Sequence, residues 1–212
     1  MSEVYNEDYY TRGEALGISN YSDYRWMPDA SLPMVDHLKR FLHIQDGESL
    51  IEIGTARGYA VKALRMRSVN AWGYDISKWA VENCDPQVKQ YVTNDNAILR
   101  NPYDFLYMKD AAEHCTVEQL CEMLPPVLRN IRKTACFIVP LARDTGGPYI
   151  NPLDQKDATH IIRWTMQDWL TFLQKMDCSF VVSGSYRVPL LKLSSELYPC
   201  SAAFIKMERF ET

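Results

Sequence analysis

The regular alternation of short apolar segments with amphipathic segments is the feature that most constrains the fold of this chain. Alternation at this spacing is typical of an α/β protein, in which a mostly parallel sheet carries helices on both faces. The last two apolar segments are separated only by residues 187–199, which contain two prolines and no convincing helical pattern. We therefore expect these two strands to form an antiparallel pair at a sheet edge. The predicted strands are 50–53, 70–74, 88–93, 103–108, 135–139, 180–186 and 202–207.

Capping residues mark the starts of most predicted helices. A serine or threonine before a helix accepts a hydrogen bond from a first-turn amide that otherwise has no partner. A threonine followed three residues later by Gln or Asp has the spacing of a capping box. The predicted helices are 31–43 (capped by Ser31), 59–67, 77–84 (capped by Ser77), and two that open at Thr116/Gln119 and at Thr165/Asp168.

Two adjacent prolines stand inside the helix that opens at Thr116. Its apolar residues Leu120, Leu124, Leu128 and Ile131 recur at helical spacing. Proline lacks the amide donor and clashes with the preceding turn. We therefore expect Pro125-Pro126 to kink this helix or divide it into two pieces.

The first thirty residues differ in kind from the rest of the 212-residue chain. They hold six acidic and two basic side chains, whereas residues 31–212 are balanced in charge. Five tyrosines and a tryptophan also lie there. We expect residues 1–30 to form a tyrosine-rich arm or cap that packs through its rings on a domain of residues 31–212. An acidic arm favours a cationic or neutral ligand over an anionic one.

Several classes of partner and site are disfavoured by composition. The chain has no basic footprint for phosphates, so we expect no nucleic-acid partner. It lacks an apolar run of roughly 20 residues and a secretory pattern, so we expect a cytoplasmic protein with no membrane partner. None of the six cysteines form C-x-x-C, and no metal site is expected. A homodimer is left open.

A turn of small residues follows the first predicted strand, in the sequence Glu52-Ile53-Gly54-Thr55-Ala56-Arg57-Gly58. Its small side chains leave room for a ligand to approach the backbone. The helix that follows would direct its free amides at such a ligand. The glycine spacing of dinucleotide-binding proteins fails here, since Ala56 and Tyr59 replace two of the required glycines. A nicotinamide oxidoreductase is therefore disfavoured.

Acidic residues follow the next two predicted strands. Asp75 ends the second strand, where a carboxylate accepts two hydrogen bonds from a ribose diol. Asn94-Asp95-Asn96 ends the third, where a carboxylate would accept from an adenine amino group. In open α/β sheets, ligands bind at the carboxyl ends of the strands. Together with the turn, these acids indicate a nucleoside-binding site.

With these residues, the sequence resembles the class I S-adenosylmethionine-dependent methyltransferases over roughly residues 50–186. Segment 52–58 resembles the first motif of the family, Asp75 its ribose-binding acid, and residues 94–96 its Gly-Asp-Ala segment beside adenine. Segment 103–106 resembles the start of the family's fourth strand, and 109–114 its Asp-x-x-Glu-His stretch. Residues 157–160 and 164–165 resemble a segment common in small-molecule and sugar methyltransferases. The resemblance implies a Rossmann-like, doubly wound sheet of seven strands whose last strand is antiparallel.

The resemblance also implies a cofactor, S-adenosyl-L-methionine, and a set of site residues. The chemistry of the residues adds three candidates for catalysis: His114 as a base, His160 as a base or a substrate contact, and Asp110 as a substrate contact. His160 lies in the long loop 143–164, which we expect to act as a lid. Ile76 would pack on adenine. The predicted cofactor-binding residues are Glu52, Gly54, Thr55, Ala56, Gly58, Asp75, Ile76, Asn94, Asp95 and Lys109.

The leading interpretation is an enzyme that transfers a methyl group from S-adenosylmethionine to a small-molecule acceptor. The transfer is an in-line displacement, so alignment and exclusion of water are the main demands on the protein. Two alternatives remain: a methyltransferase acting on a protein or other macromolecule, and a catalytically silent module that has kept only the binding pocket.

Overall fold

A single seven-stranded sheet organises the chain in the computed structural model, which describes residues 3–187 and 200–210. The strand order is β3-β2-β1-β4-β5-β7-β6. Neighbouring strands are parallel from β3 to β5, whereas β7 runs antiparallel to both β5 and β6. The predicted α/β architecture, Rossmann-like with an antiparallel last strand, is confirmed. The strands are β1 (Ser49–Ile53), β2 (Asn70–Tyr74), β3 (Val92–Thr93), β4 (Tyr103–Lys109), β5 (Ile131–Pro140), β6 (Phe180–Arg187) and β7 (Ala202–Arg209).

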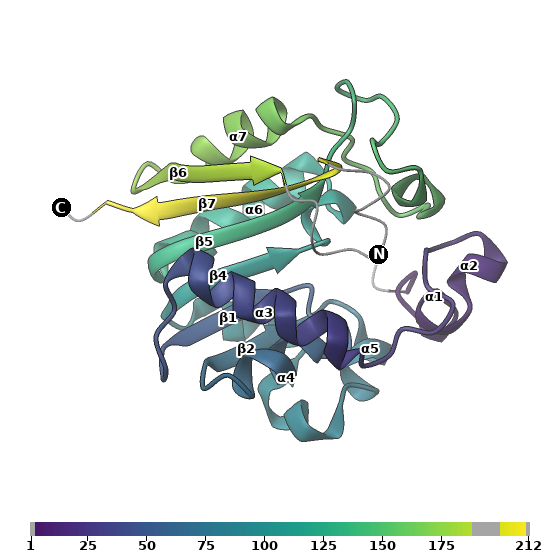
Figure 1. The fold of residues 1–212 in the computed structure, drawn as a ribbon, viewed down its shortest axis with the longest axis horizontal. Coiled ribbons are helices and arrows are strands. Elements are labelled where there is room, and N and C mark those ends of the chain that lie inside the picture. Colours follow the sequence, from purple (N-terminus) through teal and green to yellow (C-terminus); the bar gives the residue numbers. More distant parts are fainter. Residues whose placement is uncertain (1–2, 188–199, 211–212) are drawn as a thin grey trace.

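Helices cover both faces of this sheet (Figure 1). Side chains at alternate positions of a strand point to opposite faces. In β4, Leu106 and Met108 pack with α6 and α7, whereas Phe105 and Tyr107 pack with α3 and α4. Burial of each large apolar side chain contributes about 1.5–3 kcal/mol. The helices are α1 (Glu7–Thr11), α2 (Gly13–Leu16), α3 (Pro28–Leu42), α4 (Tyr59–Arg65), α5 (Lys78–Glu82), α6 (Val117–Arg129) and α7 (Met166–Gln174).

The pairing register brings the carboxyl ends of the central strands level with one another. Ile53, the last residue of β1, lies opposite Tyr74 of β2 and Met108 of β4. The residues that follow these positions therefore emerge side by side at one edge of the sheet. The short helices α1 and α2 lie beyond the end toward which the arrow of β4 points (Figure 1).

The predicted strand 88–93 is largely wrong. A 3-10 helix, η1 (Pro86–Tyr91), occupies most of it, and only Val92–Thr93 pair with β2. Proline at the first helical position is already close to helical φ. The Asp85 side chain also accepts a hydrogen bond from the Gln87 amide at 3.0 Å. This local capping outweighs the β propensity of the valines.

The first long helix begins earlier than predicted. Helix α3 starts at Pro28 rather than at Ser31, and its N-cap residue Met27 makes no side-chain capping bond. Pro28 again sets the helical φ in advance, so the chain enters the helix before it reaches the serine.

Helix α6 remains one element, so the predicted division at Pro125-Pro126 is wrong, whereas the alternative, a kink, stays a prediction. The carbonyls that lose their amide donors belong to Cys121 and Glu122, two exposed residues whose carbonyl groups water can reach. Ile131, predicted on this helix, instead begins β5. The predicted capping boxes at Thr116 and Thr165 are both present.

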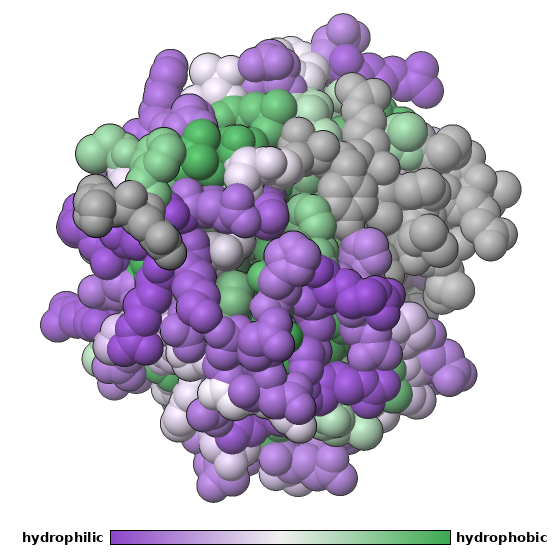
Figure 2. All heavy atoms as spheres, turned by 60° about the vertical axis from the view of Figure 1, so that its left-hand side comes forward, coloured by the Kyte–Doolittle hydropathy of each residue, from purple (hydrophilic) through white to green (hydrophobic). Residues whose placement is uncertain are grey.

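Residues 188–199 lie outside the described part of the chain, so the expected absence of a helix between the last two strands falls there. No helix within residues 3–187 and 200–210 combines the length and apolar character needed to cross a bilayer. Figure 2 brings forward the left-hand side of Figure 1, and this face is largely hydrophilic with smaller hydrophobic areas.

Replacement of the cap of α6 tests its contribution to stability. Thr116→Ala removes the hydroxyl that accepts from the Gln119 amide at 3.2 Å. We expect the free energy of unfolding, measured by urea denaturation, to fall by about 1 kcal/mol. Thr116→Ser keeps the hydroxyl and should remain close to wild type. Equal losses in both variants would contradict a capping role.

Candidate functional site

The turn after β1 is held in a conformation that few residues adopt. Gly54, Ala56 and Gly58 all have positive φ, at 80°, 49° and 75°. A Cβ atom on Gly54 would lie 2.5 Å from the Cβ of Ala111, so only glycine fits there. Ala56 adopts the left-handed conformation despite its Cβ, at a cost of about 1–2 kcal/mol. The three positions that carry these φ angles have no side chain larger than a methyl group, so little bulk of their own covers the backbone there.

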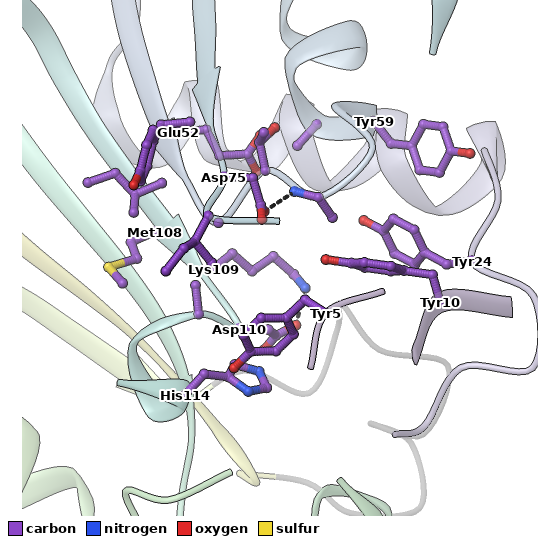
Figure 3. A pocket seen from close by; sticks show the side chains of 18 of the residues that line it. Tyr5, Tyr10, Tyr24, Glu52, Tyr59, Asp75, Met108, Lys109, Asp110 and His114 are labelled. Atoms are coloured by element: carbon purple, nitrogen blue, oxygen red, sulfur yellow. Dashed lines mark hydrogen bonds and ion pairs between the residues drawn. The ribbon is translucent and has the colours of Figure 1, made fainter. Parts of the chain in front are cut away.

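Asp75 follows β2 directly and fixes this turn. One carboxylate oxygen accepts from the Ala56 amide at 2.6 Å (Figure 3), and the other accepts from the Ser77 amide at 2.8 Å. The residue is only 6% exposed. Burial raises the pKa of its carboxyl group, and the two amide hydrogen bonds oppose that rise. The structure places this carboxylate beside the turn, and its role in binding a ribose stays a prediction.

Glu52 points from β1 into the same region. Its side chain accepts from the Thr55 hydroxyl at 2.6 Å. Burial raises the pKa of this carboxyl group to about 7, although the Thr55 hydrogen bond and the charge of Lys109 lower it. Glu52 therefore changes its protonation state near neutral pH.

A cavity of about 1170 Å³ opens in front of these residues. Most of the predicted site residues line it, but Gly58, Asn94 and Asp95 are not among the described residues that do. The Asp95 carboxylate instead accepts from the Ala97 amide and caps a 3-10 helix, η2 (Asn96–Arg100), whose first residue lines the cavity. Ile76 lines the cavity and is 47% exposed. The predicted residues that line it are Glu52, Gly54, Thr55, Ala56, Asp75, Ile76, Lys109, Asp110, His114 and His160.

The tyrosines of the N-terminal segment form one wall of the cavity (Figure 3). The ring of Tyr10 stacks on Trp79 of α5, with centroids 5.4 Å apart. The hydroxyl of Ser77 donates to the carbonyl of Tyr5. These contacts hold the segment against the residues that follow Asp75. Figure 3 shows Tyr10 and Tyr24 opposite that carboxylate.

The loop 143–164 forms another part of the cavity wall and is hydrogen-bonded to the N-terminal segment. The Tyr9 hydroxyl donates to Asp157 at 2.8 Å, and the Ala158 amide donates to the carbonyl of Ile18 at 3.3 Å. Two segments far apart in sequence thus meet at the cavity.

The two candidate bases lie together in the cavity wall. The rings of His114 and His160 are 4.6 Å apart. Burial and the neighbouring His160 lower the pKa of His114 to about 4, so this imidazole is neutral at neutral pH. Asp110 has a positive φ of 47° and forms an ion pair with Lys109.

Glu113, which was not among the site residues predicted from the sequence, also belongs to this group. The residue is fully buried beside the two histidines. One carboxylate oxygen of Glu113 and one ring nitrogen from each of the two histidines all lie within 4.8 Å of one another. The adjacency of Glu113 and His114 was visible in the sequence, but nothing there placed His160 beside them.

Comparison by sequence finds no matching family model and no significantly similar curated protein. Comparison by structure does find similar folds. Magnesium protoporphyrin IX methyltransferase from Synechocystis PCC 6803, solved with bound SAM, has a TM-score of 0.65 at 13% identity. The alignment covers 99% of this chain and 97% of that one. The same enzyme has also been solved with bound SAH.

Two further structures show how widely this fold is used. A protein from Haloferax volcanii, solved with the Trm112 methyltransferase activator, has a TM-score of 0.65 at 14% identity over 86% of this chain and 91% of that one. The small RNA methyltransferase HEN1 has a TM-score of 0.62 at 16% identity, covering 89% of this chain and 26% of that one. The chain has the class I S-adenosylmethionine-dependent methyltransferase fold, and the predicted resemblance is confirmed at that level.

The buried carboxyl group of Glu52 predicts a specific pH dependence of stability. Its pKa is about 7 in the folded chain against an ordinary value of 4.5. Between these pH values the folded chain keeps a proton that the unfolded chain has lost, so stability falls as pH rises. The loss amounts to about 3 kcal/mol across the window.

Glu52→Gln should remove this contribution. We expect the free energy of unfolding of wild type, measured in urea, to fall relative to that of the variant between pH 4.5 and 7.5. Glu82→Gln changes a 60% exposed side chain and serves as the control. Parallel pH profiles for wild type and Glu52→Gln would contradict a raised pKa.

Proposed function

We propose that this protein is an S-adenosylmethionine-dependent methyltransferase that acts on a small-molecule acceptor. The observation that carries the proposal is the buried Asp75 carboxylate at the end of β2, beside a turn of positive φ and in the wall of a large cavity. The same fold holds SAM and SAH in the Synechocystis enzyme.

The carboxylate of Asp75 has capacity for a sugar diol in addition to its present partners. An ionised carboxyl group offers about four lone-pair sites. Two of them accept from the amides of Ala56 and Ser77, one on each oxygen. The other two suit a pair of neighbouring hydroxyl donors. The hydrogen bonds from the two backbone amides hold the carboxylate in place to accept from such donors.

The enclosure of the cavity supports a small acceptor. Ligand pockets commonly have volumes of about 300–1,000 Å³, so about 1170 Å³ suits a nucleoside donor together with a second small molecule. The N-terminal segment and the loop 143–164 close over it through the Tyr9–Asp157 bond. We propose residues 1–30 as a cap and the loop as its counterpart.

The side chains around the cavity have distinct proposed roles in the transfer. The bound cofactor supplies an electrophilic methyl group. The turn at Gly54 and Asp75 would fix its position, and the tyrosine wall would exclude water. A pKa of about 4 makes His114 a weak base at neutral pH, so this side chain would position the acceptor rather than take its proton. Asp110 and His160 line the same region and would contact the acceptor.

Replacement of Asp75 tests the proposal directly by calorimetry with S-adenosylhomocysteine. We expect Asp75→Ala to weaken binding by about 1.5–3 kcal/mol, roughly 10- to 150-fold, because charged hydrogen bonds to the ribose are lost. Asp75→Asn keeps the shape of the side chain and guards against a folding defect. Asp46→Ala, in an exposed position outside the cavity, is the control. Unchanged affinity in folded Asp75→Ala, or no binding to wild type at millimolar ligand, would reject the assignment.

Transfer from methyl-labelled donor into a cell lysate, separated by size, distinguishes the acceptor classes. Label in the small-molecule fraction is the expected result. Label in protein or RNA would contradict a small-molecule acceptor and indicate a macromolecular one. Tight donor binding without transfer to any fraction would identify a silent binding module.

A further inference from the structure

Three side chains with metal-binding atoms converge at one end of the cavity. Glu113 and His114 belong to a 3-10 helix, η3 (Ala112–His114), that follows β4, and His160 belongs to the loop 143–164. Their nearest ligating atoms all lie within 4.8 Å of one another. The cysteine spacing that argued against a metal site has no bearing on such a cluster.

We propose that Glu113, His114 and His160 bind a divalent transition-metal cation. Two imidazoles and one carboxylate form a donor set that suits zinc and other first-row metals better than magnesium or calcium. Glu113 is fully buried, and His160 is 8% exposed. A cation between these three groups would place positive charge beside this buried carboxylate, which favours its ionised form.

The hydrogen bonds of His114 prepare one of its nitrogens for a metal. The Thr159 hydroxyl donates to Asp157 Oδ1 at 2.5 Å. Its single proton is thereby used, so at 2.8 Å it accepts from Nδ1–H of His114. The lone pair of this neutral imidazole then lies on Nε2. A second partner that fixes the tautomer in this way is usual for histidines that ligate metals.

The two segments that carry the proposed ligands, η3 and the loop 143–164, are hydrogen-bonded to each other. The backbone carbonyl of Glu113 accepts from the amides of Ile161 and Ile162, at 2.9 and 3.0 Å. This bracing fixes His160 relative to η3 through the backbone, so only side-chain movement is needed to complete the site.

The remaining movement is small. His160 Nε2 lies 3.9 Å from Glu113 Oε1. Metal–ligand bonds near 2.1 Å place neighbouring ligand atoms roughly 3.0–3.4 Å apart. Rotation of the side chains by less than about 1.5 Å at their tips would therefore bring the three atoms to bonding distance.

The site faces the cavity, since His114 and His160 both line it. Figure 3 shows His114 near Tyr5 and Asp110, separated from Asp75 by the side chain of Lys109. A cation there would keep an open position toward the interior. If the proposed function holds, that position would bind and orient an oxygen atom of the methyl acceptor.

Titration of the chelator-treated full-length chain with Co²⁺ tests the site without reference to activity. We expect one equivalent to bind and to produce the visible absorption of a protein-bound cobalt centre. His114→Ala and His160→Ala should each weaken binding at least about tenfold, as should Glu113→Gln, which preserves side-chain volume. Thr159→Val should weaken it about 10- to 100-fold by releasing the His114 tautomer.

His43→Asn is the matched control, because this histidine caps α3 with a φ of 57° that asparagine tolerates. It should bind Co²⁺ as wild type does. Wild type that binds no Co²⁺, or His160→Ala that binds it unchanged (for example through exposed Cys121 or Cys178), would overturn the proposal. Calorimetry with S-adenosylhomocysteine on the same samples reports separately on the proposed function, and circular dichroism verifies folding.

Discussion

The two backbone hydrogen bonds to the Asp75 carboxylate are the interaction on which the site depends. They join the turn after β1 to the start of α5, so two strand ends share one buried acceptor. Ser77, whose amide makes one of these bonds, also bonds through its hydroxyl to Tyr5. The position of the carboxylate, the shape of the turn and the docking of the N-terminal segment are therefore linked. Loss of one would disturb the other two.

Polar burial in this chain is concentrated at the carboxyl ends of the strands. The sheet and its helices bury almost only apolar side chains, whereas this edge buries Glu52, Asp75, Glu113, Asp157 and His160. Desolvation raises the pKa values of Glu52 and Asp75 and lowers that of His114. Such groups oppose folding unless they are paired, and clustering of this kind is common at binding and catalytic sites. The apolar layers supply the stability that this edge lacks.

The central sheet was predictable because its strands are continuous apolar runs bounded by small or acidic residues. Asp75 was predictable for the same reason, since it directly follows such a run. Local competition explains the errors: proline at positions 28 and 86 starts helices that propensity and capping patterns did not indicate. The proximity of Glu113 and His160 is a tertiary contact. It depends on two hydrogen bonds from backbone amides of the loop 143–164, and no local sequence pattern encodes it. The adenine-side roles of Asn94 and Asp95 stay predictions.

The hydrogen bond between Tyr9 and Asp157 has a kinetic consequence. It joins the two coverings of the cavity, together with the bond from Ala158 to Ile18. A molecule that enters or leaves between these two coverings must part them and break these hydrogen bonds. If the proposed function holds, the rate of that separation would limit turnover by this route, however fast the chemical step. The residence time of a product would be governed by a tyrosine and an aspartate that need never touch it.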